Sequence, residues 1–281
     1  MITVIIPTHN RGTDVIDAVD SVLASTQLPG EIIVVEDQSD EAQQSLADYI
    51  SSGKLRYCRR TDGISGASAT RNFGVSKATQ QYILFLDDDD TIVPTYIEKL
   101  QKYFTASSYD WGFGDVLING EITKYRAKST GHLINTKFKR KMAAMSSGFW
   151  INKELYEDVG GLDELLNIDE DTDLCCRLIA NGLNPFYLKE GAVNLARNDG
   201  NQRLTTVTDL SLKIECYYRT LVNNYDRYAN DKEAQGFLLD RVHRVMCKRK
   251  DQSDLPKLKA FSKTPSLRVV HFLRELKRGI S

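Results

Sequence analysis

Short apolar runs alternate with amphipathic stretches through the first third of the chain. Four runs rich in β-branched residues predict strands at residues 3–6, 31–35, 55–58 and 82–86. Helical spacing of apolar residues predicts helices at 13–23 and 69–77, a weaker one ending near 50, and one beginning near 95. Thr13 is the expected N-cap of the first helix. This alternation predicts an α/β fold with a mixed, mostly parallel sheet flanked by helices.

The pattern changes beyond about Thr205, where long helical repeats replace the alternation. Helices are expected at 210–228, 232–250 and 266–278. We therefore predict an α/β domain at residues 1–205 and a helical, basic C-terminal extension at residues 206–281.

Composition narrows the class of protein. The chain has 281 residues, of which 41% are hydrophobic, and a net charge of −1, so no nucleic-acid partner is expected. Its five cysteines are scattered without CxxC spacing, which indicates reduced thiols rather than a zinc site or a disulfide framework. The sequence shows neither a signal peptide nor an apolar run long enough to span a bilayer. These features predict a cytoplasmic protein.

The fourth apolar run ends in four consecutive aspartates, Asp87 to Asp90. Adjacent carboxylates repel one another unless a positive charge lies among them. A divalent cation bound to a phosphate ester would use such a cluster, because Mg²⁺ and Mn²⁺ prefer carboxylate and phosphate oxygens. The alternative is a solvated acidic turn that ends the strand and precedes a helix.

Polar residues also follow the first two strands, at Thr8 and at Glu36-Asp37. Ligands of parallel sheets bind beyond the carboxyl ends of the strands. The chain contains neither G-x-G-x-x-G after its first strand nor a P-loop, which disfavours a dinucleotide fold and a P-loop nucleotide site. What remains is a nucleotide site made of carboxylates, with a metal ion for the diphosphate.

The motifs in this order resemble those of family 2 glycosyltransferases of the GT-A fold. They are VIIPTHNR at 4–11, IIVVEDQS at 32–39, ATRNFG at 69–74, FLDDDD at 85–90, VGGLDE at 159–164 and EDTDL at 170–174. The resemblance covers about residues 1–205 and implies an inverting, metal-dependent enzyme that uses a nucleotide sugar. It also implies that residues 1–205 are the catalytic domain, with a nucleotide-sugar half at about 1–110 and an acceptor half at about 111–205. The order and spacing are specific for the family but not for the sugar.

The resemblance implies a role for each matching residue. The nucleotide pocket would be lined by Pro7, Thr8, Asn10, Arg11, Asp37, Ser65, Gly66, Arg71 and Asp88. Within it, Asp37 would accept a hydrogen bond from the base, Ser65, Gly66 and Arg71 would lie near the base, and Asp88 would hold the ribose. Asp89, with Asp87 close by, would bind Mn²⁺ or Mg²⁺. Asp171 would be the general base, at the N-terminus of its helix; without the resemblance, that acid could simply complement the helix dipole.

Three departures from the family pattern stand out. His9 replaces the usual Tyr, and Glu36 replaces the usual Asp. Asp199 occupies about the place of a His that helps to hold metal or diphosphate in many relatives, so the third metal ligand is open. Arg203 could supply positive charge to the diphosphate instead.

The C-terminal segment is strongly basic. From Arg241 onward it has twelve Lys and Arg against three Asp and Glu, a net charge of +9. The helix expected at 266–278 has an apolar side bordered by basic residues, which is typical of a peripheral helix on the inner face of the cytoplasmic membrane. The alternative is that this side packs on the catalytic domain or on a second subunit, as in a homodimer.

We therefore predict a hexosyltransferase that moves a sugar, expected from a UDP-sugar, to a hydroxyl of a glycan or lipid-linked acceptor in bacterial surface polysaccharide synthesis, such as lipopolysaccharide, O-antigen or capsule. The alternatives are a polyprenyl-phosphate glycosyltransferase and a nucleotide-sugar hydrolase on the same scaffold. A nucleotidyltransferase is disfavoured because the first turn lacks a Gly-rich motif. A non-catalytic binding module is disfavoured because Asp89 and Asp171 are both present.

Overall fold

A computed structural model describes residues 1–122, 125, 127–142, 147–195 and 209–246 of the chain. Within these residues the strands are β1 (Ile2–Thr8), β2 (Glu31–Asp37), β3 (Arg56–Arg60), β4 (Tyr82–Phe85), β5 (Asp90–Ile92), β6 (Trp111–Ile118), β7 (Gly131–His132), β8 (Trp150–Asn152) and β9 (Phe186–Leu195). They form one sheet in the order β3-β2-β1-β4-β8-β6-β9-β5, and β7 also pairs with β9.

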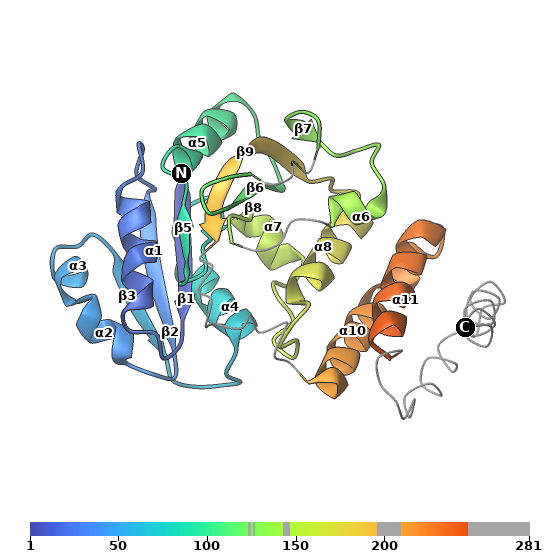
Figure 1. Ribbon diagram of the computed structural model, residues 1–281, viewed down its shortest axis with the longest axis horizontal. Helices are drawn as coiled ribbons and strands as arrows, with labels where there is room; N and C mark the ends of the chain where they lie inside the picture. Colours follow the sequence, from blue (N-terminus) through green and yellow to red (C-terminus); the bar gives the residue numbers. More distant parts are fainter. Residues whose placement is uncertain (123–124, 126, 143–146, 196–208, 247–281) are drawn as a thin grey trace.

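The helices in the described part are α1 (Asp14–Leu23), α2 (Glu41–Ser45), α3 (Ala47–Ser51), α4 (Ala67–Lys77), α5 (Tyr96–Ala106), α6 (Phe138–Lys141), α7 (Lys153–Asp158), α8 (Glu170–Ala180), α10 (Leu210–Asn224) and α11 (Lys232–Met246). A 3₁₀ turn, η1 (Asp226–Tyr228), follows α10. Helices flank the sheet on both faces, with α1 to α3 at one end of the molecule and α10 and α11 at the other (Figure 1).

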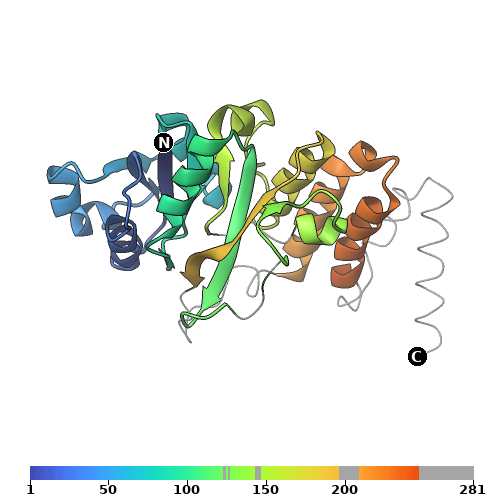
Figure 2. The same cartoon turned by 90° about the horizontal axis from the view of Figure 1, so that it is seen from above.

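The sheet is mixed, and its first four strands along the chain are parallel to one another. β3, β2, β1 and β4 are parallel, whereas β8 runs antiparallel to both β4 and β6. β6 and β9 are parallel to each other, and β9 pairs antiparallel with β5 and β7. Figure 2 shows the long strands β6 and β9 crossing the middle of the molecule, between the N-terminal strands and the C-terminal helices. The predicted α/β fold with a mixed sheet flanked by helices is confirmed.

Alternating side chains of the buried strands form the two hydrophobic layers. Val4 and Ile6 of β1 lie in the layer with α1 and α5, whereas Ile5 between them lies in the layer with α4, α7 and α8. All three are fully buried. Because successive side chains of a strand point to opposite faces, one continuous apolar run supplies both layers.

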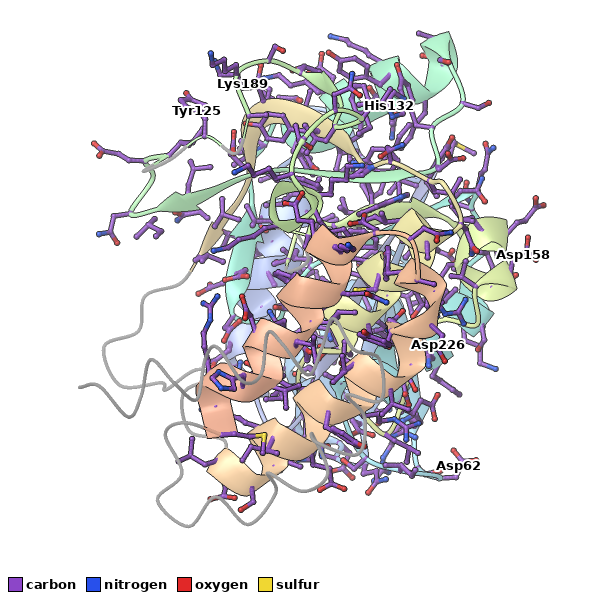
Figure 3. The ribbon with its side chains drawn as sticks, turned by 90° about the vertical axis from the view of Figure 1, so that its right-hand side faces the viewer. Asp62, Tyr125, His132, Asp158, Lys189 and Asp226 are labelled. Carbon is purple, nitrogen blue, oxygen red and sulfur yellow. The ribbon has the colours of Figure 1, made fainter. Side chains whose placement is uncertain are left out.

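The helices of the C-terminal extension pack on the helix α8. Leu221 of α10, Leu238 of α11 and Phe138 of α6 form a separate core cluster with Cys176 of α8. Figure 3 looks at the molecule from this end, with α10 and α11 in front and Asp226 labelled near the turn between them. Two of the predicted helices are therefore present, and they cover the helix that begins at Glu170.

Some details differ from the sequence predictions. β3 continues to Arg60 instead of ending near Cys58, and the weak helix before it consists of α2 and α3. Thr13 is the N-cap of α1, but its hydroxyl makes no capping hydrogen bond. The helix expected at 266–278 lies outside the described residues.

Both tryptophans and two of the cysteines lie in the core. Trp111 and Trp150 are fully buried packing residues, and Cys175 and Cys176 are small buried residues of α8. The described cysteines are free thiols. Within the part of the chain that the structure describes, no helix has both the length and the apolar character needed to cross a membrane.

Candidate active site

The carboxyl ends of β1, β2 and β4 bring polar residues to one edge of the sheet. Thr8 of β1 pairs in register with Glu36 of β2, and Leu86 after β4 donates its backbone N–H to Ile5 of β1. Thr8 and Asp37 are both buried at this edge. The parallel arrangement therefore gathers the residues predicted to line a nucleotide pocket.

Asp37 is the centre of the first group of contacts at this edge. One carboxylate oxygen accepts a hydrogen bond from Arg60 Nη2 at 2.7 Å. The other accepts from Ser65 Oγ at 2.6 Å and from the backbone N–H of Gly66 at 2.9 Å. Asp37 and Arg60 are 3% and 5% exposed, so the ion pair is shielded from solvent. The structure thus brings together Asp37, Ser65 and Gly66 as predicted, and adds Arg60.

The turn after β1 is attached to the end of β2. His9 Nδ1 lies 2.6 Å from the backbone carbonyl of Asp37. Asn10 has a positive φ of 52° and donates its backbone N–H to Ser39 Oγ. Asn tolerates this left-handed conformation better than most residues. The turn therefore directs Arg11 toward the acidic segment after β4.

Arg11 lies among the aspartates that follow β4. Its Nη1 donates to Asp88 at 2.9 Å and to Asp89 at 2.8 Å. Burial raises the pKa of Asp88 to about 6, although a hydrogen bond from Thr8 and the charge of Arg11 oppose this rise. The guanidinium offsets the repulsion that four adjacent carboxylates would otherwise generate.

Three of these aspartates could hold a metal ion. Oxygen atoms of Asp87, Asp89 and Asp90 all lie within 4.8 Å of one another. The donor set is made only of hard carboxylate oxygens, which fits Mg²⁺ or Mn²⁺. The sequence prediction named Asp87 and Asp89 but missed Asp90, although its place in the same acidic run was a signal.

Arg71 connects this acidic segment to α8. Its Nη2 donates to Asp87 at 2.6 Å, and its Nη1 donates to Glu170 at 3.3 Å. The sequence prediction placed Arg71 near the base of the nucleotide. In the structure, Arg71 instead contacts a carboxylate of the acidic segment and a carboxylate of α8. Burial, and then the neighbouring Asp171, raise the pKa of Glu170 to about 7, and Arg71 opposes this shift.

Asp171 lies in the first turn of α8, as the sequence predicted. Its Oδ1 accepts hydrogen bonds from the backbone N–H of Thr172 at 2.6 Å and from Thr172 Oγ1 at 3.3 Å. Burial raises the pKa of Asp171 above its ordinary value. A carboxylate with a raised pKa is a stronger proton acceptor, which suits a general base.

Loops from distant parts of the chain hold α8 against α4. Asn72 of α4 accepts hydrogen bonds through Oδ1 from the backbone N–H of Leu162 at 3.0 Å and from Tyr156 O–H at 2.5 Å. It also donates to the carbonyl of Leu162 at 2.9 Å. These contacts join the motif at 69–74 to the motif at 159–164 in the folded chain.

Two candidate residues, Asp199 and Arg203, lie outside the described residues.

His9 and Glu36, which depart from the family pattern, both make contacts near the end of β2. His9 contacts the backbone of β2. Glu36 is fully buried and accepts hydrogen bonds from Tyr57 O–H at 2.6 Å, Ser39 Oγ at 2.7 Å and the backbone N–H of Ala42. The longer side chain of Glu thus holds α2 and β3 against the end of β2.

Comparison with known families identifies the family to which the chain belongs. Residues 3–160, more than half of the chain, match the family described as glycosyl transferase family 2. The chain therefore belongs to family 2 of the glycosyltransferases, and its fold is of the GT-A type.

Curated relatives agree with this assignment. An uncharacterized glycosyltransferase, YibD of Escherichia coli K12, is 30% identical over 160 residues, which are 53% of this chain and 45% of YibD. The chain thus spans less than half the length of that relative. A putative colanic acid biosynthesis glycosyl transferase of the same organism, WcaA, is 26% identical over 257 residues, which cover 86% of this chain and 88% of WcaA.

Solved structures show the same fold. TarS 1-349 of S. aureus, crystallised in complex with UDP-GlcNAc, superposes with a TM-score of 0.69 at 17% identity. The similarity covers 95% of this chain and 77% of that one.

Proposed function

We propose that this protein transfers a sugar from a UDP-sugar to a hydroxyl group of a glycan acceptor, with inversion, in the synthesis of a bacterial surface polysaccharide. The printed names of two similar proteins support the donor and the pathway class, since TarS was crystallised with UDP-GlcNAc and WcaA is assigned to colanic acid synthesis. The observation on which the proposal chiefly depends is the arginine bridge of Arg71, which joins the acidic segment after β4 to the first turn of α8.

In this proposal Asp37 accepts a hydrogen bond from the N3–H of uracil. Arg60 forms an ion pair with Asp37, and Ser65 and Gly66 fix the orientation of its carboxylate. Pro7, Thr8, Asn10 and Arg11 line the pocket along the edge of the sheet, and Asp88 holds the ribose. Pro7, Thr8 and Asp88 are buried at this edge, Arg11 is partly buried, and Asn10 is exposed.

Asp87, Asp89 and Asp90 would hold Mn²⁺ or Mg²⁺. Such an ion stabilises the negative charge that develops on the departing diphosphate. In the apo structure Arg11 contacts Asp89, so nucleotide binding is expected to move the Arg11 guanidinium from the carboxylates toward phosphate oxygens.

Asp171 accepts the proton of the acceptor hydroxyl as that oxygen attacks the anomeric carbon. Asp171 lies in the first turn of α8, apart from the strand ends proposed to bind the nucleotide. A base on the face opposite the leaving group would give direct displacement with inversion. The two hydrogen bonds from Thr172 occupy one oxygen of the carboxylate and leave the other available for the hydroxyl.

The test is a panel of nucleotide sugars screened with and without Mn²⁺ for thermal stabilisation, because a ligand that binds only the native state raises its apparent stability. A UDP-sugar that stabilises the protein only with Mn²⁺ would support the proposal. Stabilisation by GDP-sugars alone would contradict the donor assignment, and release of free sugar at full rate without any acceptor would identify a hydrolase.

The site of action is a second part of the proposal. We propose that the protein acts at the cytoplasmic face of the membrane, where it would meet a lipid-linked acceptor. The basic segment at 266–278, which lies outside the described residues, would make the contact with the membrane. Salt-sensitive binding to anionic vesicles that is lost on removal of residues after Pro265 would support this contact. A truncated protein that instead dissociates from a dimer would show that the segment is a subunit contact.

A further inference from the structure

Arg241 of α11 contacts the segment that precedes the proposed base. Its Nη2 forms an ion pair with Asp169 Oδ1, and its guanidinium lies 4.6 Å from the ring centre of Tyr217 and 5.5 Å from that of Phe237. The Asp169 side chain is 1% exposed and that of Arg241 is 28% exposed. This arginine lies outside residues 3–160, to which the family match is confined.

Asp169 is the N-cap of α8 and has a left-handed backbone, with φ 73° and ψ 5°. A residue other than Gly adopts this conformation at some cost, and the surrounding structure must hold it there. Asp169 also accepts the first helical hydrogen bond, from the backbone N–H of Asp173. Its conformation therefore sets the direction in which α8 begins and in which Asp171 projects.

The three consecutive acids at this turn have different partners. Arg241 binds Asp169 and Arg71 binds Glu170, so arginines from α11 and α4 approach from two sides. The hydrogen bonds accepted by Asp171 come from Thr172. The arginines thus neutralise the two flanking acids, while Asp171 keeps a carboxylate oxygen for substrate.

The helices that present Arg241 are themselves fixed to α8 and to the loop before it. Arg219 of α10 donates to both carboxylate oxygens of Asp163 at 2.5 and 3.0 Å. Asn224 donates to Asp173 at 2.7 Å, and Tyr228 O–H donates to the carbonyl of Cys176 at 2.5 Å. α10 and α11 therefore form a fixed support for the start of α8.

We propose that Arg241 is a positioning residue for glycosyl transfer, which holds the turn at Asp169 so that the carboxylate of Asp171 faces the acceptor hydroxyl. This inference rests on the proposed role of Asp171 as the general base. It assigns to the α10–α11 pair a part in the reaction itself, since the helices fix the geometry of the base without touching the nucleotide.

The expected effect of losing Arg241 is on turnover. Displacement of a catalytic group by about 1 Å can cost up to about 10²-fold in rate. For Arg241→Met, which keeps the apolar stem that covers Tyr217, we expect kcat for UDP release to fall roughly 10- to 100-fold when it is measured in Mn²⁺ with a glycan acceptor and the UDP-sugar that stabilises the protein in the screen. The KM for the donor should stay within about twofold, because the nucleotide site lies at the edge of the parallel strands.

Three further variants separate positioning from general destabilisation. Arg241→Lys keeps the charge and should restore part of the lost kcat, though not all, because Lys cannot reproduce a stacked guanidinium. Arg244→Met changes an exposed arginine one turn along the same helix and should leave kcat, KM and the unfolding midpoint unchanged. Tyr228→Phe removes a hydrogen bond between the helices and α8 without touching Asp169, and should lower stability more than kcat.

A double-substitution cycle tests the route through Asp169. If Arg241 acts through this carboxylate, Arg241→Met combined with Asp169→Asn should lower kcat no further than the more severe single variant. Faster amide hydrogen exchange at residues 169–172 in Arg241→Met, with no change in Arg244→Met, would show directly that the turn has loosened.

Several outcomes would overturn the inference. One is a wild-type kcat for Arg241→Met, and a second is a loss of kcat in Tyr228→Phe as large as that in Arg241→Met. A third is full additivity of the Arg241 and Asp169 substitutions. Failure of the proposed function is distinguishable, because in that case Asp171→Asn would keep the wild-type rate, whereas an inactive Asp171→Asn with a normal Arg241→Met would refute this inference alone.

Discussion

The two halves of the candidate site are assembled in different ways. On the nucleotide side, the polar residues follow β1, β2 and β4, and the parallel sheet brings them to one edge. On the acceptor side, the acids at the start of α8 are held by Arg71 from 99 residues earlier and by Arg241 from 72 residues later. The first half thus depends on the sheet, and the second on side-chain contacts between separate helices.

This difference indicates how each half should respond to substitution. A change at the sheet edge should affect nucleotide binding and leave the rest of the site in place. A change at the start of α8 should affect turnover. A change of Arg71, which bridges the two halves, should affect both nucleotide binding and turnover. The following predictions test this division, in order of decreasing expected effect.

Asp89→Ala should abolish metal-dependent binding of UDP, because a carboxylate ligand and its charge are both lost. Isothermal titration with UDP in the presence and absence of Mn²⁺ would measure this. Asp62→Ala, at an exposed position of the same half, is the matched control. Unchanged affinity in Asp89→Ala would remove Asp89 from the metal site.

Asp171→Asn should lower kcat by about 10²- to 10⁴-fold while UDP binds normally, because the amide cannot accept a proton at neutral pH. Asp158→Asn, which alters an exposed acid of α7, should have no effect on kcat. If activity of Asp171→Asn survives within a few-fold, Asp171 only complements the dipole of α8.

Arg71→Met should lower the free energy of unfolding by about 3 kcal/mol, because it leaves two largely buried acids without their partner. It should also reduce both UDP affinity and turnover, unlike the two preceding substitutions. Urea denaturation and binding measurements would show this. Arg56→Met breaks an exposed ion pair with Glu31 and should cost less than about 1 kcal/mol.

Glu36→Gln should lower the free energy of unfolding by about 1–2 kcal/mol at neutral pH without affecting turnover. Burial alone would raise the pKa of Glu36, but hydrogen bonds from Tyr57, Ala42 and Ser39 lower it below its ordinary value. A lowered pKa in the native state means that the ionised group stabilises the fold above its unfolded pKa, and that this stability is lost as the pH falls through the native pKa.

The difference between Glu36→Gln and the natural protein should therefore shrink as the pH is lowered through and below about 4. Unfolding curves at pH 7 and at pH 3 would measure it. A difference that is constant over this range would show that the carboxylate charge contributes little, and that the hydrogen bonds of Glu36 are equally well made by an amide.

The sequence by itself determined the α/β alternation and the grouping of polar residues at the carboxyl ends of β1, β2 and β4. Val4, Ile5 and Ile6 are apolar without interruption because β1 is buried on both faces. A strand of this kind can be recognised in the sequence from its continuous apolar run. Thr8, Asp37 and Asp87 then come together because the carboxyl ends of parallel strands share an edge. α8 was also foreseen, since Leu174 and Leu178 recur at helical spacing.

Only the tertiary structure decided which charged groups meet. The chain has 37 Lys and Arg and 38 Asp and Glu, so neither composition nor spacing could select the partners of Asp37, Glu170 or Asp169. Arg60 was missed because β3 runs two residues farther than its apolar pattern suggests, which takes Arg60 to the end of β2. Arg241 was counted with a basic tail, whereas the packing of α10 and α11 on α8 places it beside Asp169. A contact between distant helices depends on how their apolar faces pack, and that is a property of the folded chain rather than of any local pattern.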